Sequence, residues 1–389
     1  MTERPTPPSQ SPVHPPSEPE VAPAAASTEH SMIAARPAPI SRHGVAGWLR
    51  SRLFSTPLNS VVSLITLAVL VWALTPLVQW ALIDADWIGT TREACSGEGA
   101  CWVFISARFE TIVYGFYPES ERYRVDITLA LLVATIAWLM IPRLPAKRWV
   151  VIFALVGFPV IAWLLLLGGH FGLPAVPTRQ WGGLMLTLTV AIVGIVGSLP
   201  LGVILALGRR SQMPLVRSLS VVFIEFWRGV PLITVLFMAS VMLPLFVPSE
   251  VEFDKLLRAL IGIMFFWSAY MAEVVRGGLQ AIPRGQEESA KALGLGYWRR
   301  MGLIILPQAL KLVIPGIVNT FIALFKDTSL VLIIGLFDLL AIIRAGLTDT
   351  NWLGFATEGY VFAALMFWIF CFGMSRYSQY IERRLHTGH

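Results

Sequence analysis

The chain has few charged residues. Asp, Glu, Lys and Arg make up only 14% of its 389 residues, whereas 56% are hydrophobic and the mean hydropathy is +0.68. Soluble domains carry about a quarter charged residues, so this balance excludes an ordinary soluble domain and indicates a membrane protein. The charge-free runs at 53–83, 149–171 and 181–208 are each long enough to cross a hydrocarbon core of about 30 Å as a helix.

These runs also lack the alternation of polar and apolar residues that strands of a membrane β-barrel show. We therefore expect an all-α integral membrane protein that forms a helical bundle. About eight transmembrane helices are expected, at residues 58–83, 125–142, 149–169, 182–208, 230–248, 257–277, 309–326 and 359–377.

Nucleotide-binding and metal-binding patterns are absent from the sequence. No Gly-Lys pair occurs, and hence no G-x-x-x-x-G-K-[ST] sequence, whose backbone N–H groups would cradle phosphates. The six histidines show no metal spacing, and all but His170 lie in the tails. We expect no catalytic site, metal site or cofactor in this chain. The energy for any pumping would come from another subunit or from an ion gradient.

Cysteine is scarce, with three residues. Cys371 lies in an apolar run and is expected to be a small buried hydrophobic residue. Cys95 and Cys101 share a loop that we place outside the cytoplasm, where a disulfide could form. Two free thiols fit the sequence equally well.

The net charge of +6 is carried mainly by basic residues at helix ends, which set topology, and these form no patch that would bind nucleic acid. With both termini in the cytoplasm, inside loops are basic and outside loops hold acids such as Glu250 and Glu252. Residues 1–45 are rich in Pro and are expected to form a disordered cytoplasmic tail. Residues 46–180 would form an extension with three spans, and residues 181–389 a core with five.

A polar interruption at 282–301 reads IPRGQEESAKALGLGYWRRM. Pro283 suits a helix start, and Glu287 and Lys291 stand four apart on one face of an exposed helix at 286–293. Gly294 and Gly296 allow a sharp exit. Such a helix, with small residues between two spans, can seat in a groove of another protein. An ordinary amphipathic loop helix is the alternative.

At these positions the chain resembles the permeases of ABC importers. Their EAA signature, E-A-A-x3-G-x9-I-x-L-P, is matched except that Ser289 replaces an Ala. The resemblance implies that the cytoplasmic loop 283–305 contains a coupling helix that docks into an ATPase subunit. The coupling residues that it implies are Glu288, Ser289, Ala290, Gly294, Leu306 and Pro307.

Further segments resemble permeases of the polar amino-acid family, among them EFWRGVPL at 225–232 and AEVVRGGLQAIPRGQ at 272–286. The long extension is similar to one permease subunit of the general L-amino acid transporters. The resemblance implies an inner-membrane complex that moves L-amino acids from periplasm to cytoplasm. Its other members would be a second permease, expected to be a paralogue, ATPase subunits that bind ATP and Mg, and a periplasmic binding protein.

Charges inside the membrane mark candidate substrate contacts. Lys326 and Asp327 are the best of these, because we expect a helix to begin at Asp327, Thr328 and Ser329, which are good N-cap residues. Its positive end, with Lys326 beside it, could hold a substrate carboxylate. The alternative is a snorkelling lysine beside a helix cap. The segment that follows, 328–358, could dip into the membrane as a re-entrant helix if its Asp338 and Arg344 lined protein or water.

Two acid–base pairs lie near the inner face. Glu225 and Arg228 are three residues apart, as are Glu273 and Arg276. We interpret both as structural ion pairs that hold the bundle or its inner gate, in preference to substrate contacts.

Two other classes of protein are weighed against the importer. A stand-alone ion-coupled transporter would predict inverted repeats, which the sequence does not show, and a membrane scaffold would leave the amino-acid-family segments unexplained. The sequence leaves open which amino acids are carried and what the extension does.

Overall fold

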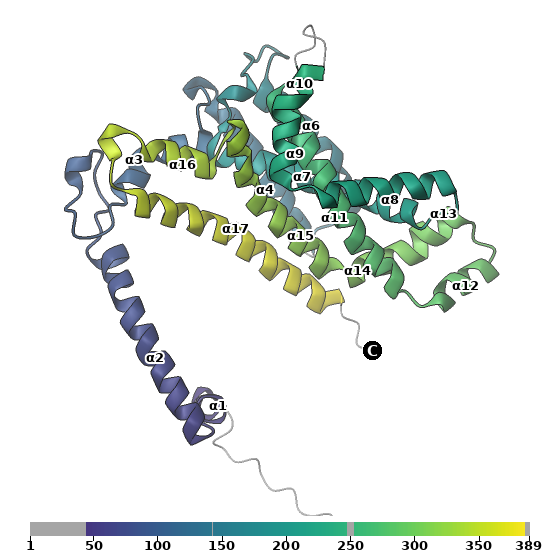
Figure 1. Ribbon diagram of the computed structural model, residues 1–389, viewed down its shortest axis with the longest axis horizontal. Coiled ribbons are helices and arrows are strands. Elements are labelled where there is room, and N and C mark those ends of the chain that lie inside the picture. Colours follow the sequence, from purple (N-terminus) through teal and green to yellow (C-terminus); the bar gives the residue numbers. More distant parts are fainter. Residues whose placement is uncertain (1–43, 142, 247–252, 386–389) are drawn as a thin grey trace, which may run out of the picture. The chain divides into compact units, whose positions relative to one another are not determined.

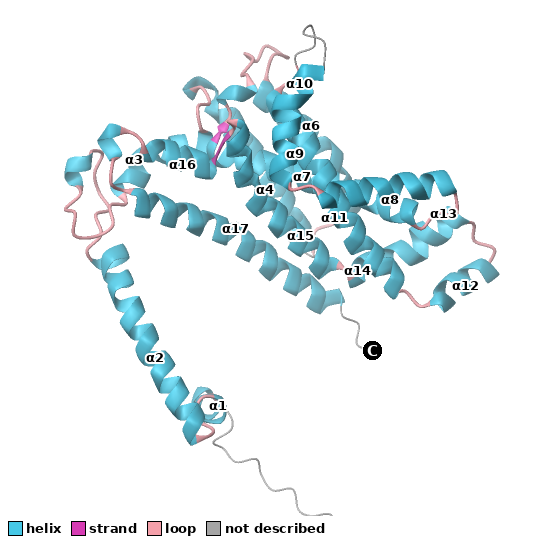
Figure 2. Ribbon diagram, in the orientation of Figure 1, coloured by secondary structure: helices cyan, strands magenta, loops and turns pink. Residues whose placement is uncertain are grey.

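The structure is a computed structural model that describes residues 44–141, 143–246 and 253–385. The expected Pro-rich tail falls almost wholly on residues 1–43, and Glu250 and Glu252 also lie outside the described residues. The described chain is helical apart from its loops and one two-residue strand, β1 (Phe337–Asp338), as Figure 2 shows. The expected all-α fold is confirmed.

Contacts within the chain divide it into two compact units, and the boundary along the sequence falls between Leu74 and Thr75. The described part of the first unit holds α1 (Val45–Arg52) and most of α2 (Pro57–Val78). All later helices belong to the second unit, and each unit is described by itself.

Seven helical segments among the described residues are long and apolar enough to cross a membrane. An eighth candidate is a bent pair, Pro214–Gly229 with Leu232–Phe246, whose halves meet at 101°. The expectation of about eight spans is thus confirmed. The seven are Pro57–Ile83, Glu119–Met140, Lys147–Leu167, Gly183–Arg209, Lys255–Ala281, Ile314–Ile334 and Ala356–Arg384.

Two expected spans differ from the structure in their boundaries. The span expected at 230–248 is only the second half of the bent pair, because the residue before Pro231 takes an extended conformation that ends α8 (Pro214–Gly229). The span expected at 309–326 is interrupted at Val313, and a new helix then begins with a Pro in its first turn. The sequence pattern alone marked neither break. The helices that result are α9 (Leu232–Phe237), α10 (Leu243–Phe246), α14 (Leu306–Leu312) and α15 (Ile314–Asp327).

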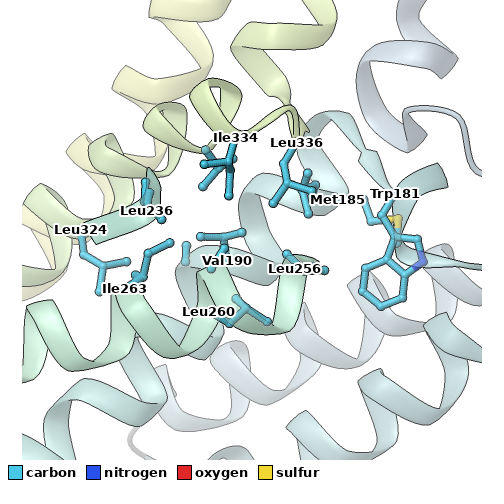
Figure 3. Close-up of a cluster of buried hydrophobic side chains, with 14 of the residues drawn as sticks. Trp181, Met185, Val190, Leu236, Leu256, Leu260, Ile263, Leu324, Ile334 and Leu336 are labelled. Atoms are coloured by element: carbon cyan, nitrogen blue, oxygen red, sulfur yellow. The ribbon is translucent and has the colours of Figure 1, made fainter. Parts of the chain in front are cut away.

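The centre of the second unit is the packing of α7 (Gly183–Arg209) against α11 (Lys255–Ala281). Small residues on α7 let the backbones approach closely, because a Cβ on Gly202 would lie 2.7 Å from the Cβ of Met271. Figure 3 shows a buried apolar cluster between α7 and α11, to which α9 and α15 also contribute side chains. Its labelled members are Trp181, Met185, Val190, Leu236, Leu256, Leu260, Ile263, Leu324, Ile334 and Leu336.

Helix α3 (Val103–Tyr114), in the expected extension, packs against core helices α7, α16 (Leu339–Leu347) and α17 (Ala356–Leu385). The Phe104 ring lies 5.6 Å from that of Trp352, and Arg108 forms an ion pair with Asp349. The N–H of Cys101 donates to a carboxylate oxygen of buried Glu358 at 3.2 Å. Contacts therefore cross the expected boundary at residue 180, and the division into extension and core stays a prediction.

Of the two alternatives for Cys95 and Cys101, the structure contains the disulfide. Their Cα atoms lie 5.6 Å apart, within the range that a disulfide spans. Cys371 is a free, half-buried thiol. The remaining helices of the second unit are α4 (Arg122–Met140), α5 (Lys147–Ile152), α6 (Phe158–Leu167), α12 (Arg284–Ala292) and α13 (Tyr297–Arg300).

The expected re-entrant segment holds a 3-10 turn (Thr328–Ile334), β1 and α16. Asp338 is fully buried and caps α16 by accepting the N–H groups of Leu340 and Ala341. Arg344 is exposed. The segment overlaps two candidate spans, at the end of Ile314–Ile334 and at the start of Ala356–Arg384, and contains no complete one. That it enters the membrane as a re-entrant segment stays a prediction.

Burial of Asp338 makes stability depend on pH. Burial raises the pKa of this carboxyl to about 6, although the backbone N–H groups oppose the shift. An acid whose pKa is raised in the folded state stabilises it fully at low pH and loses that stability as pH rises through about 6. Replacing Asp338 by Asn removes the titrating group and keeps one of the two oxygens that accept the cap N–H groups. We expect the melting temperature of wild type in detergent to fall between about pH 4 and pH 6 and to level off above about pH 7, and that of D338N to fall less over the same range. Equal slopes would contradict the assignment.

Candidate functional site

Helix α12 is the short exposed helix that the sequence predicts, and it begins after Pro283 as expected. It ends at Ala292, and Gly294 in the turn that follows has a φ of +73°, in the left-handed region that favours glycine. The N–H of Leu295 donates to the carbonyl of Ala290, and the N–H of Gly294 donates to that of Lys291, which closes the helix end. In Figure 1 α12 lies beyond the end of α11.

One face of α12 is fixed and the other is free. Ala290 is buried, while Glu287 forms ion pairs with Lys291 at 3.3 Å and with Arg300 of α13 at 3.4 Å. Glu288 and Ser289 are exposed. The structure thus orients the predicted coupling residues in two directions, with Glu288 and Ser289 available to a partner.

Sequence reasoning missed two apolar side chains near this face. Leu293 is 76% exposed and Trp298 is 78% exposed, and both flank the turn at Gly294. Large exposed apolar residues beside an acidic one are typical of a protein-binding surface. The signal was the group of large side chains in the otherwise small and polar run 284–300, namely Leu293, Leu295, Tyr297 and Trp298.

The last two predicted coupling residues shape the loop. Leu306 packs against a buried cluster, and Pro307 is exposed in the first turn of α14, where a missing N–H costs nothing. Next to them, the Gln308 side-chain amide donates to Gln286 of α12 at 3.3 Å. Helices α12 and α14 are therefore joined across the loop.

The four charges expected as two ion pairs form one cluster. Glu273 of α11 contacts Arg276 at 2.7 Å, Arg209 of α7 at 3.1 Å and Arg228 of α8 at 3.9 Å. Glu225 contacts Arg209 at 3.6 Å. The pairing of Glu273 with Arg276 is confirmed.

The pairing of Glu225 with Arg228 is wrong. Arg228 turns toward α11, where its guanidinium carbon lies 5.5 Å from the centre of the Tyr270 ring and its nitrogen faces Glu273. Arg209, a basic residue at the end of α7, joins the two acids. Three helices, α7, α8 and α11, are thus linked through Glu273, whose side chain is only 17% exposed.

The helix expected to start at Asp327 is a 3-10 helix (Thr328–Ile334) that continues α15, and no side chain caps it. Lys326 and Asp327 are the last residues of α15, and the chain continues in right-handed conformation through Thr328 into the 3-10 turn. The Thr328 hydroxyl donates back to the Phe325 carbonyl, and that of Ser329 to the Lys326 carbonyl. Both hydroxyls therefore bond to carbonyl oxygens of the preceding helical turn and do not cap the N–H groups of a new helix. The capped helix that follows is α16, so no positive helix end lies beside Lys326.

Comparison with known proteins identifies the family. The family described as "Binding-protein-dependent transport system inner membrane component" matches residues 198–387. The inner membrane amino-acid ABC transporter permease protein YhdY of Escherichia coli (strain K12) is 56% identical over 354 residues, which cover 91% of this chain and 96% of YhdY. The glutamate/glutamine/aspartate/asparagine transport system permease protein BztC of Rhodobacter capsulatus is 40% identical, covering 92% of this chain and 98% of BztC.

A solved structure, that of an amino acid ABC transporter with histidines, is 28% identical over 52% of this chain and 92% of its own, with a TM-score of 0.46. The chain has a bundle of candidate spans and an exposed helix in a loop between them, and it matches the family model. These features together define its class as a transport permease. The chain belongs to the family of amino-acid ABC transporter permeases. It is a multi-pass inner-membrane subunit and not itself an enzyme, because in this family a separate ATPase handles ATP, and a binding protein is the other partner.

Proposed function

We propose that this permease carries L-amino acids from periplasm to cytoplasm and that α12 is the surface on which its ATPase acts. The observation that carries the proposal is the free face of α12, where Glu288 and Ser289 are exposed beside the apolar side chains of Leu293 and Trp298. The names of the relatives YhdY and BztC support amino acids as the substrate class, and the name of BztC includes acidic amino acids and their amides.

The connection between α12 and the bundle is short. Only Ile282 and Pro283 separate the end of α11 from the start of α12. With α12 also joined to α13 and α14, a displacement of α12 would pass to α11 with little slack. Glu273 lies eight residues before the end of α11, about 12 Å along the helix axis. The charge cluster around Glu273 would thus act as an inner latch that loosens when the ATPases move α12.

Lys326 and Asp327 remain our candidates for the substrate pathway, together with Thr328 and Ser329. Lys326 is exposed and Asp327 is half-buried at the end of α15. Without a helix end beside it, the Lys326 ammonium alone would attract a carboxylate. We expect Lys326→Gln to raise the substrate concentration for half-maximal uptake more than it lowers the maximal rate.

The rest of the assembly follows the same proposal. The partner ATPases bind ATP and Mg, a periplasmic protein delivers the amino acid, and a paralogous chain supplies the second permease, so that the pair is a heterodimer. Both termini of this chain lie in the cytoplasm.

Uptake into proteoliposomes tests the proposal. The chain is reconstituted with its second permease and ATPase, and labelled amino acids are supplied with the binding protein in the presence of internal ATP. We expect accumulation of glutamate, glutamine, aspartate or asparagine that needs both ATP and the binding protein. Accumulation by this chain alone, driven by an ion gradient, would instead support the stand-alone transporter.

A further inference from the structure

An apolar groove lies between α11 and the second half of the bent pair. It has a volume of about 520 Å³, and Arg258 is the one charged residue among the described residues that line it. Met238, Met242 and Phe246 form one wall, and Leu257 and Ile261 of α11 form the other. Helix α9 and the π-helical turn Met238–Met242 pack against α11.

The groove is about as long as one leaflet of a bilayer is thick. On α11 its lining runs from Leu257 to Phe265, eight residues or about 12 Å. Half of a hydrocarbon core of about 30 Å is about 15 Å. At the far end the chain bends by 101° into α8, whose Phe226 and Trp227 close the groove. A transmembrane helix of a partner would need a surface that continues through both leaflets. An acyl chain needs a surface in only one leaflet.

Arg258 lies one turn into α11, next to Leu257, the first α11 residue that lines the groove. One of its guanidinium nitrogens donates to the Ser240 carbonyl at 2.7 Å and to the Ala239 carbonyl at 3.4 Å, both in a π-helical turn. Its Nε is buried without a hydrogen-bond partner among the described residues. Nearby Asp254 accepts hydrogen bonds from the Leu257 N–H and the Thr178 hydroxyl and forms no ion pair with Arg258. The positive charge thus has no acidic partner in the part of the chain that is described.

We propose that this groove binds a phospholipid, with one acyl chain along the α9–α11 contact and the phosphate on Arg258. A guanidinium matches a phosphate in charge and in donor geometry, and the groove supplies an apolar lining of one leaflet's depth. The lipid belongs to the leaflet in which α11 begins. The bound chain fills the space between α11 and the bent pair and supports the helix that leads into α12. The proposal needs only a membrane-embedded chain and does not depend on the coupling role of α12.

Lipid retained by the purified importer complex tests this. We would compare wild type with Ala239→Phe, which fills the groove, and Arg258→Gln, which keeps an amide near the Ser240 carbonyl but removes the charge. Val241→Phe and Arg179→Gln are matched controls at exposed positions outside the groove. After the complex is washed in mild detergent, its bound phospholipid is measured by an organic-phosphate assay and by mass spectrometry. We expect about one phospholipid fewer per chain in each groove variant than in wild type, and no loss in the two controls. Unchanged lipid in folded groove variants would overturn the proposal.

A second measurement separates lipid from other occupants. A phospholipid with a photoreactive group in its acyl chain is added to cells, and the labelled complex is purified and digested. We expect the retained label on the peptide that contains Met238 and Met242, and no displacement of lipid by inorganic phosphate. Efficient crosslinking of a Met242→Cys variant to the second permease, or label spread evenly over exposed α17, would overturn the proposal.

Discussion

Reversing the charge at Glu288 is expected to reduce ATP-driven uptake at least about 25-fold, because residues at the centre of an interface can each contribute about 2 kcal/mol or more and about 1.4 kcal/mol is tenfold. Glu288 is exposed on α12 and forms no ion pair with a described residue. E288R should therefore leave the permease folded while the ATPase no longer co-purifies. Uptake in proteoliposomes and recovery of the ATPase from detergent measure the two effects.

Gly294→Glu should give the same loss by another route, because a side chain at φ +73° strains the turn that ends α12. Glu382→Arg is the matched control, since it reverses an exposed acid near the end of α17. We expect wild-type uptake from this control. If E288R and wild type recover the ATPase equally, α12 is not the coupling surface.

Replacing Glu273 by Gln is expected to have the largest effect on stability. Three guanidiniums would lose their shared acid at a site that is only 17% exposed. Removing one partner of a buried ion pair costs about 3–5 kcal/mol, and the partly exposed arginines reduce this to about 2 kcal/mol. The melting temperature of the purified permease should fall by several degrees, and uptake should fall with it.

Glu225→Gln is the control for this effect. Its carboxylate is 63% exposed and contacts a single arginine at 3.6 Å, so little change in stability is expected. If Glu273 also acts as an inner latch, E273Q should raise ATP hydrolysis in the absence of binding protein, whereas E225Q should not. Equal melting temperatures for E273Q and wild type would contradict the role of the cluster.

The spans and α12 could be predicted because their signals are local. Charge-free runs fix the spans, and Pro283 and Gly294 limit α12 through their own backbone preferences. The same reasoning failed at Thr328, because Ser and Thr hydroxyls serve both N-caps and helix interiors and the sequence does not say which.

Contacts between helices were not predictable in the same way. The spacing of Glu225 and Arg228 suggested a pair, but the orientation of α8 brings Arg228 to Glu273 and Tyr270 of α11. The docking of α3 against α16 and α17 likewise depends on tertiary packing and left no pattern in the extension. The exposure of Trp298 required the structure, because the sequence does not say which side of α13 faces solvent.

Crosslinking from position 289 tests the central claim most directly. Ser289 is exposed on α12, and a Ser289→Cys variant in a Cys371→Ser background places one free thiol there. With the ATPase present, a short thiol–amine crosslinker should join the two subunits, and Glu382→Cys should give no product. A product from position 382 with none from position 289 would show that the ATPase binds elsewhere and would contradict the account.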